Sequence, residues 1–182
     1  MALSLAACGG SSTTTAVTPV VDTPVVDTPV VDTPVVDAAT SQAFTANLDN
    51  LKGGSGDDSF NGVYYADGGT GTTAFPGDVV DGGAGADTLN ISVAGLSTAA
   101  VSINAIRTSN VETVLVTNYD TNATGGQDTT IDTSLMAGIV NVGLNASSAV
   151  GDTIFTGMTS IVGASMANGA GDLTLTYTAT PI

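Results

Sequence analysis

From about residue 43 onward, the chain alternates short apolar runs with turns that are rich in Gly, Asn and Asp. No stretch in this part has a convincing helical period of about 3.6 residues, and only residues 97–107 are compatible with a short helix. The pattern predicts strands at residues 87–93, 111–117, 129–132, 139–144, 153–155, 160–162 and 173–178.

Two families of predicted strands alternate along this region. One family opens on an acidic residue, in Asp87-Thr88-Leu89, Asp128-Thr129-Thr130, Asp152-Thr153-Ile154 and Asp172-Leu173-Thr174, and the other covers residues 110–114, 138–142 and 157–161. Interleaved strands at loose spacings of about 20 to 28 residues indicate stacked rungs, each of which buries its apolar face only against its neighbours. The predicted fold is therefore all-β, a parallel β-solenoid of the β-helix or β-roll kind, with a β-sandwich as the alternative.

Charge and composition exclude several classes of function. The chain has 17 acidic residues against Lys52 and Arg107, a formal net charge of −15 that repels nucleic acid. Histidine is absent and Cys8 is the single cysteine, so His-based triads, thiolate zinc sites and disulfide frameworks cannot form. Glu112 is the only Glu, and nothing in the sequence pairs it with a particular Asp for a two-carboxylate mechanism. We therefore predict a protein without catalysis.

The N-terminal residues predict a targeting signal, with an unmodified N-terminus that happens to contain Cys8 as the alternative. Leu5-Ala6-Ala7-Cys8 resembles the lipobox of bacterial lipoproteins, which implies cleavage before Cys8 and attachment of a lipid to that thiol. We interpret residues 1–8 as a truncated lipoprotein-type signal that ends in the lipobox cysteine. Through this lipid, the protein is expected to be anchored to the outer membrane.

Residues 9–42 form a low-complexity spacer in front of the predicted β-repeat domain at residues 43–182. The spacer contains four tandem copies of Thr-Pro-Val-Val-Asp at residues 18–37, in which each Pro removes a backbone donor and prevents a helix. Either an extended spacer of roughly 60 Å, at about 3.1 Å per residue, or a disordered linker fits this composition.

Two glycine-rich turns run directly into predicted strands. Residues 53–61 and 82–90 both fit the pattern G-G-x-G-x-D-x-U-x, in which U is a large apolar residue. The glycines permit positive φ and bring carbonyl oxygens together, while the Asp supplies the anionic oxygen that calcium prefers. A weaker third copy at residues 67–75 has Thr73 in place of the Asp. The glycine pairs begin at 53, 68 and 82, which is not the nine-residue spacing of back-to-back copies. Any ion site would therefore have to be assembled by one or two loops that fold over a strand edge. The alternative is that these segments are ordinary turns.

Three consecutive blocks, at residues 49–61, 77–91 and 109–114, resemble the repeat module of bacterial surface-layer proteins and related RTX-like β-strand-repeat surface proteins. The resemblance covers roughly residues 44–182 and implies an extracellular β-solenoid stabilised by Ca²⁺. It places calcium ligands at the carboxylates of Asp58 and Asp87 and at the backbone oxygens of Gly54, Gly56, Gly83 and Gly85. Proximity in sequence adds the candidates Asp57, Asp67, Asp78 and Asp81.

Together these features predict a non-catalytic structural protein at the cell surface. It is expected to self-assemble with other copies of itself or related surface proteins into a surface layer or filament. The two alternatives are a lipid-anchored adhesin or ligand-binding stalk, and an accessory RTX-like region of a larger secreted hydrolase.

Overall fold

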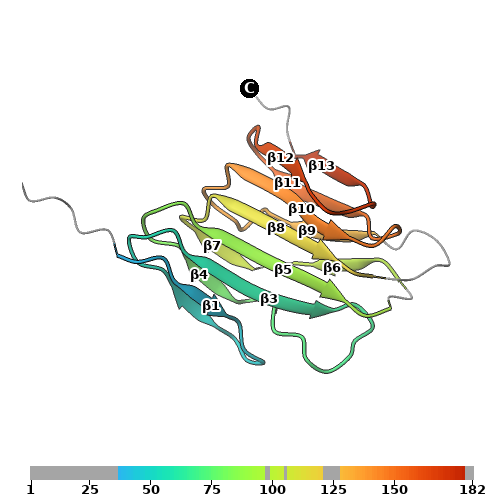
Figure 1. Ribbon diagram of the computed structural model, residues 1–182, viewed down its shortest axis with the longest axis horizontal. Helices are drawn as coiled ribbons and strands as arrows, with labels where there is room; N and C mark the ends of the chain where they lie inside the picture. The colour runs from blue at the N-terminus through green and yellow to red at the C-terminus, as the bar shows by residue number, and fades with distance from the viewer. Residues whose placement is uncertain (1–36, 97–98, 105, 121–127, 179–182) are drawn as a thin grey trace, which may run out of the picture. The chain divides into compact units, whose positions relative to one another are not determined.

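The computed structural model describes residues 37–96, 99–104, 106–120 and 128–178, which lie in one compact unit, Val35–Ile182. Every regular element within these ranges is a strand (Figure 1). The strands are β1 (Ser41–Ala43), β2 (Asn50–Lys52), β3 (Ser59–Tyr65), β4 (Val79–Asp81), β5 (Thr88–Ala94), β6 (Val101–Ile103), β7 (Arg107–Ser109), β8 (Thr113–Asn118), β9 (Thr129–Asp132), β10 (Asn141–Ser147), β11 (Thr153–Met158), β12 (Gly163–Met166) and β13 (Leu173–Tyr177). No helix of the length and apolarity needed to cross a membrane occurs among the described residues.

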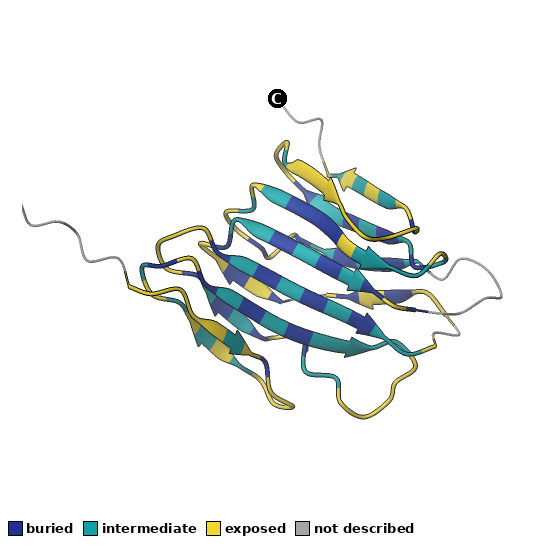
Figure 2. Ribbon diagram, in the orientation of Figure 1, coloured by how far each residue is buried: buried dark blue, intermediate teal, exposed yellow. Residues whose placement is uncertain are grey.

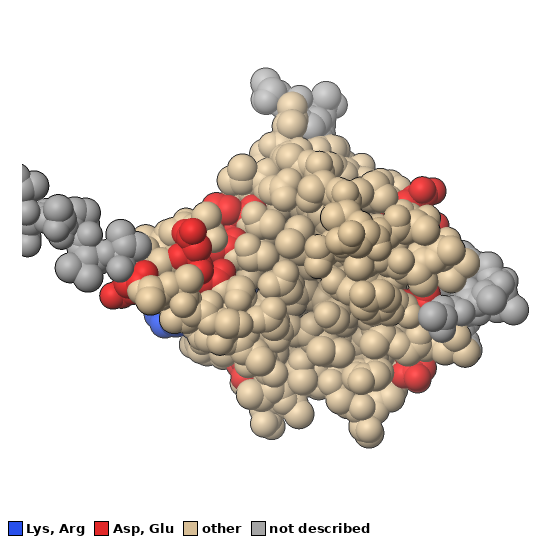
Figure 3. Space-filling model, viewed as in Figure 1, with Lys and Arg blue, Asp and Glu red and all other residues tan. Residues whose placement is uncertain are grey.

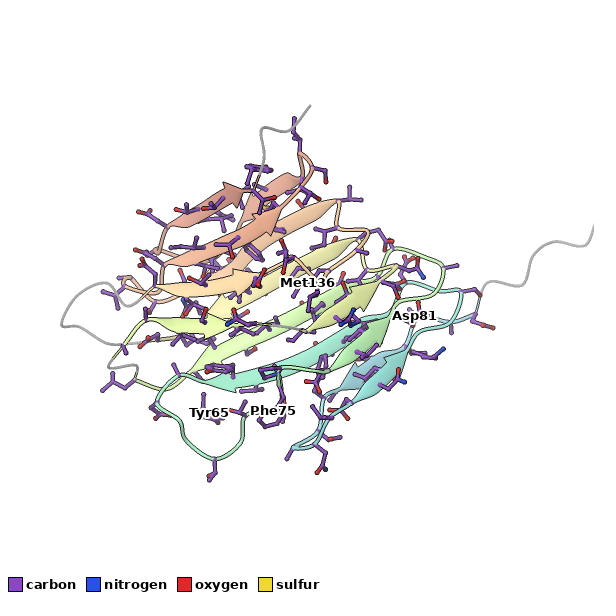
Figure 4. All side chains as sticks on the ribbon, turned by 180° about the vertical axis from the view of Figure 1, so that it is seen from behind. Tyr65, Phe75, Asp81 and Met136 are labelled. Carbon is purple, nitrogen blue, oxygen red and sulfur yellow. The ribbon has the colours of Figure 1, made fainter. Side chains whose placement is uncertain are left out.

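The strands form three parallel sheets. A six-stranded wide sheet has the order β1-β3-β5-β8-β10-β12, a four-stranded sheet has β13-β11-β9-β6, and a three-stranded sheet has β2-β4-β7. The chain passes from β5 in the wide sheet to β6 in the four-stranded sheet, to β7 in the three-stranded sheet, and then back to β8 in the wide sheet. Met136 continues the three-stranded layer through a parallel bridge to Thr108 (Figure 4). The chain thus winds through the three sheets in turn, and each strand pairs in parallel with the strand of the next rung. This arrangement confirms the predicted β-solenoid and excludes the β-sandwich.

Stacking of successive rungs builds the core. In β5, Leu89, Ile91 and Val93 are buried and alternate with half-buried residues, as a two-residue strand period requires (Figure 2). Leu89 lies in register between Phe60 of β3 and Val114 of β8, and all three side chains are fully buried. Each rung therefore buries its apolar side chains against the rungs above and below it.

Two sequence expectations for secondary structure are wrong. The region expected to hold a short helix, residues 97–107, instead contains β6 and the start of β7 in its described part, because Val101 and Ile103 face the core while Ser102 between them faces outward. The strand expected at residues 160–162 is a loop, and β12 follows it. Strands β1, β2 and β4 had no counterpart in the prediction, since each has only three residues, and β3 was predicted only as the strand that the first glycine turn enters.

The first strand begins ahead of the expected domain boundary at residue 43. β1 starts at Ser41, the Thr40 N–H donates to Asp58 at 2.6 Å, and the Asp37 N–H donates to the Ser55 hydroxyl at 2.8 Å. The end of the predicted spacer therefore contacts the first glycine turn. The rest of the spacer and Cys8 lie outside the described residues.

Candidate functional site: the stacked glycine turns

The two glycine-rich turns lie one above the other at one edge of the solenoid. Residues 53–58 join β2 to β3, residues 82–87 join β4 to β5, and residues 110–112 join β7 to β8. Each of these connections leads from the three-stranded sheet to the wide sheet. We call this stack of three turns the acidic corner, and Figure 3 shows acidic side chains gathered at that edge.

Glycine is required here because the stacked backbones approach each other closely. Gly83 has φ 96°, and a Cβ at this position would collide with the carbonyl oxygen of Gly54 in the turn below. The Gly54 carbonyl accepts the Ala84 N–H at 2.9 Å. A side chain at Gly82 would likewise collide with the carbonyl oxygen of Asn110. The glycines therefore allow direct backbone contact between successive turns.

The acidic residues of the corner form a ladder of carboxylates. Asp58, Asp87 and Glu112 immediately precede β3, β5 and β8, and each accepts a backbone N–H from the preceding rung. The Thr40 N–H donates to Asp58 Oδ1 at 2.6 Å, the Asp58 N–H to Asp87 Oδ1 at 2.7 Å, and the Asp87 N–H to Glu112 Oε2 at 2.8 Å. These charge-assisted bonds satisfy amides that the strand ladders leave free. The motif carboxylates therefore hold one rung to the next.

Hydrogen bonding and burial shift the pKa values of the two motif aspartates, Asp58 and Asp87, in opposite directions. Asp58 accepts the Thr40 hydroxyl at 2.7 Å and the Gly54 N–H at 2.6 Å, and these bonds lower its pKa. Asp87 is 1% exposed, and its Oδ2 has no hydrogen-bond partner among the residues that the structure describes. Burial raises the pKa of Asp87, and the nearby charges of Glu112, Asp58 and Asp57 raise it further.

We expect Asp87→Asn and Asp58→Asn to change stability in opposite directions when no divalent cation is present. The pKa of Asp87 is higher in the fold than its ordinary value of 3.8, so its ionisation opposes folding and stability falls as pH rises through the folded pKa. Asp87→Asn keeps an oxygen for the Asp58 N–H and should raise the melting temperature at neutral pH. The pKa of Asp58 is lowered, so its stabilisation is present above 3.8 and is lost as pH falls through the folded pKa. Asp58→Asn should therefore lower the melting temperature at neutral pH, and by less in acid.

Thermal unfolding followed by circular dichroism in EGTA, from acid to neutral pH, measures both effects. An Asp87→Asn protein that melts below the wild type at neutral pH would show that the ionised Asp87 side chain is stabilising. That result would contradict a raised pKa of Asp87 in the folded protein.

Of the other predicted acidic ligands, two lie in the corner. Asp57 accepts the Ala86 N–H at 2.8 Å across the stack. Asp81, at the end of β4, accepts the Asn110 side-chain amide at 2.9 Å, and this bond lowers its pKa (Figure 4). Both carboxylates therefore tie adjacent turns together.

The remaining two candidates lie elsewhere. Asp67 follows the far end of β3 and accepts the Gly69 N–H at 2.8 Å. Asp78 is fully buried before β4, at the end opposite Asp81, and accepts the N–H groups of Asp49 at 2.9 Å and Phe75 at 2.7 Å. Proximity in sequence did not bring these two carboxylates to the corner, because β3 and β4 separate them from it.

Sequence reasoning left Glu112 without a partner, whereas the structure places it directly above Asp87. A signal for this was present in the sequence. Asp58-Ser59-Phe60, Asp87-Thr88-Leu89 and Glu112-Thr113-Val114 share an acid, then a hydroxyl residue, then a large apolar residue. In all three cases the hydroxyl residue is the first residue of a strand in the wide sheet.

The oxygens of the corner suit a hard cation in their chemistry. Ca²⁺ takes carboxylate and backbone carbonyl oxygens. Asp87 Oδ2 is a buried carboxylate oxygen that has no hydrogen-bond partner in the described part of the chain, and its charged neighbours are negative. In the described part of the chain, no three Asp, Glu, His or Cys side chains gather as a ligand group. A calcium ion at this corner would therefore use Asp87 together with backbone carbonyls of the glycine turns.

Comparisons with protein-family models, with curated proteins and with solved structures find no match to this chain. The class of the protein is accordingly defined by its own geometry: a parallel β-solenoid with an acidic corner of stacked glycine turns.

Proposed function

We propose that this protein is a non-catalytic structural component of the bacterial cell surface that binds calcium and assembles with other copies of itself or related surface proteins. The observation that carries the proposal is the distribution of charge. The six strands of the wide sheet contain no Asp, Glu, Lys or Arg, although the chain has a net charge of −15. Figure 3 shows this broad face without charge and the acidic side chains at its margins.

An uncharged sheet face favours association between copies. Its outward positions include short, uncharged side chains such as Asn90, Ser92 and Thr117. Charged side chains are depleted from the centres of protein interfaces, because burying them costs more than pairing returns. Repulsion between acidic margins keeps single copies apart until cations screen it.

The edge strands offer a second route to assembly. All four residues of β12 are exposed, with Met166 at 54%, and Ile161 ahead of the strand is 72% exposed. β1 and β12 are the two edges of the wide sheet in the described chain. Edge strands with free backbone groups are templates for a further strand, so another copy can extend the solenoid.

Calcium is the proposed switch for assembly. A cation at Asp87 would neutralise the carboxylate whose ionisation opposes folding, and so stabilise the corner. Attachment through a lipid on Cys8 would hold the assembly at the outer membrane; this part of the proposal is supported by the sequence Leu5-Ala6-Ala7-Cys8 alone.

We expect Ca²⁺ added to EGTA-treated protein to raise the melting temperature and to produce large particles. At a calcium concentration 100-fold above Kd, the gain in stability is about 2.7 kcal/mol. Circular dichroism and light scattering on the full chain measure both responses, with Mg²⁺ as the control cation. Asp87→Asn should abolish the calcium response, whereas Asp67→Asn, whose carboxylate lies away from the corner, should keep it.

Protein that is equally stable and equally monomeric in EGTA and in calcium would contradict the calcium part of the proposal. Particles that form in both conditions would retain assembly and remove calcium as its switch.

A further inference from the structure

A pocket of about 520 Å³ lies on the solenoid away from the acidic corner. Its lining comes from the end of β3 and the β3–β4 loop (residues 66–78), with Tyr64, Tyr65 and Phe75, and from β6 and the residue after it, with Ser102 and Asn104. Figure 4 shows Tyr65 and Phe75 at this loop. The volume falls within the range of about 300–1,000 Å³ that is typical of small-molecule sites.

Aromatic side chains are concentrated here. The chain has 4 Tyr and 4 Phe and no Trp, and three of these eight side chains line this one pocket. The rings of Tyr64, Tyr65 and Phe75 are half-buried, whereas Phe60 and Phe155 are fully buried in the core. The pocket rings therefore keep surface that a ligand can cover.

The polar groups of the pocket are all uncharged. Thr72 Oγ1 accepts the Tyr65 N–H at 3.1 Å, which leaves its own proton for another acceptor. Ser102 Oγ donates to Asn104 Oδ1 at 3.2 Å, which leaves the Asn104 NH₂ group as a donor. Among the described residues, no Asp, Glu, Lys or Arg lines the pocket, and the net charge of −15 repels anions.

The β3–β4 loop contains the weak third copy of the glycine motif, and it has a different role from the other two copies. Thr73, which stands in place of the motif Asp, accepts the Val63 N–H through its hydroxyl at 2.9 Å and so ties the loop to β3. Gly69 and Gly71 lie against the ring of Tyr65. This copy therefore forms a pocket wall and orients an aromatic ring.

We infer that this pocket binds a neutral sugar residue of a glycan. A pyranose has an apolar face of C–H groups that packs on the negative face of an aromatic ring, and a rim of hydroxyls that both donate and accept hydrogen bonds. Tyr65 and Phe75 provide ring surface, and Thr72, Ser102 and Asn104 provide neutral donors and acceptors. A purely apolar ligand would leave these polar groups without partners. The inference is independent of calcium binding and of assembly.

The test is binding of a panel of neutral oligosaccharides, built from glucose, mannose, galactose and N-acetylglucosamine, to the full chain. Saturation-transfer NMR detects the bound sugar in every variant, and intrinsic tyrosine fluorescence reports Kd in all of them except Ser102→Trp, whose added Trp interferes. We expect at least one sugar to bind with a Kd of roughly 1 mM or below, as a site for a single ring implies. Tyr65→Ala and Phe75→Ala should each weaken binding at least tenfold, and Ser102→Trp should block the pocket from an outward-facing position.

Two controls separate loss of the site from loss of the fold. Tyr119→Ala removes a tyrosine that is 55% exposed outside the pocket and should bind the sugar as the wild type does. Tyr65→Phe keeps the ring and should retain most of the affinity. Absence of binding across the panel, or binding that survives Tyr65→Ala, Phe75→Ala and Ser102→Trp, would overturn the inference. Occupation of the pocket by a synthetic Thr-Pro-Val-Val-Asp peptide in preference to every sugar would also overturn it.

Discussion

Gly83→Ala is expected to lower the free energy of unfolding by about 3 kcal/mol, whereas Gly68→Ala lowers it by about 1 kcal/mol. Both glycines have positive φ, 96° at Gly83 and 73° at Gly68, so both variants place an alanine in left-handed backbone. They differ in surroundings. A Cβ at Gly83 collides with the carbonyl oxygen of Gly54, while a Cβ at Gly68 meets nothing within 4 Å. The difference between the two variants therefore isolates the stacking of the glycine turns.

Urea denaturation in EGTA measures this difference without any contribution from calcium. Circular dichroism before denaturation checks that each variant is folded. Equal losses of stability in the two variants would mean that the turn at residues 82–87 does not stack on the turn at residues 53–58, and the acidic corner described above would be wrong.

Thr117→Glu is expected to raise the protein concentration at which particles form at least tenfold, and Thr130→Glu is expected to leave it near the wild-type value. Both residues are half-buried, outward-facing threonines in the interior of a sheet. Thr117 lies in β8 of the uncharged wide sheet, and Thr130 lies in β9 of the four-stranded sheet. A tenfold change corresponds to about 1.4 kcal/mol per contact, which is modest for a buried like-charge contact.

Light scattering against protein concentration in calcium gives the threshold for particle formation, and circular dichroism checks the fold of both variants. Equal thresholds for the two variants would show that the wide sheet is not the assembly face. A larger effect of Thr130→Glu would move the interface to the four-stranded sheet.

Much of the candidate site was readable in the sequence. The glycine pattern at residues 53–61 and 82–90 predicted two turns that enter strands, and Asp58 and Asp87 do lie together beside their glycines. The same reasoning included Asp67 and Asp78, which the fold places elsewhere, and left out Glu112, which completes the carboxylate ladder. Closeness along the chain was a poor guide because β3 carries the chain away from the corner before Asp67, and β4 returns it only after Asp78. Glu112, by contrast, lies one full circuit of the solenoid after Asp87.

The sequence by itself determined the local structure. Alternation of apolar and polar residues determined all-β structure, and Gly next to Asp determined the turns, because these preferences act over a few residues of backbone and side chain. Only the tertiary structure decided which rung contacts which. Asp58 and Asp87 are 29 residues apart and Asp87 and Glu112 are 25 apart, so their pairing depends on the unequal lengths of whole rungs. The aromatic pocket likewise joins Tyr65 to Ser102 only because β6 winds back beside the β3–β4 loop, and no short-range pattern encodes that meeting.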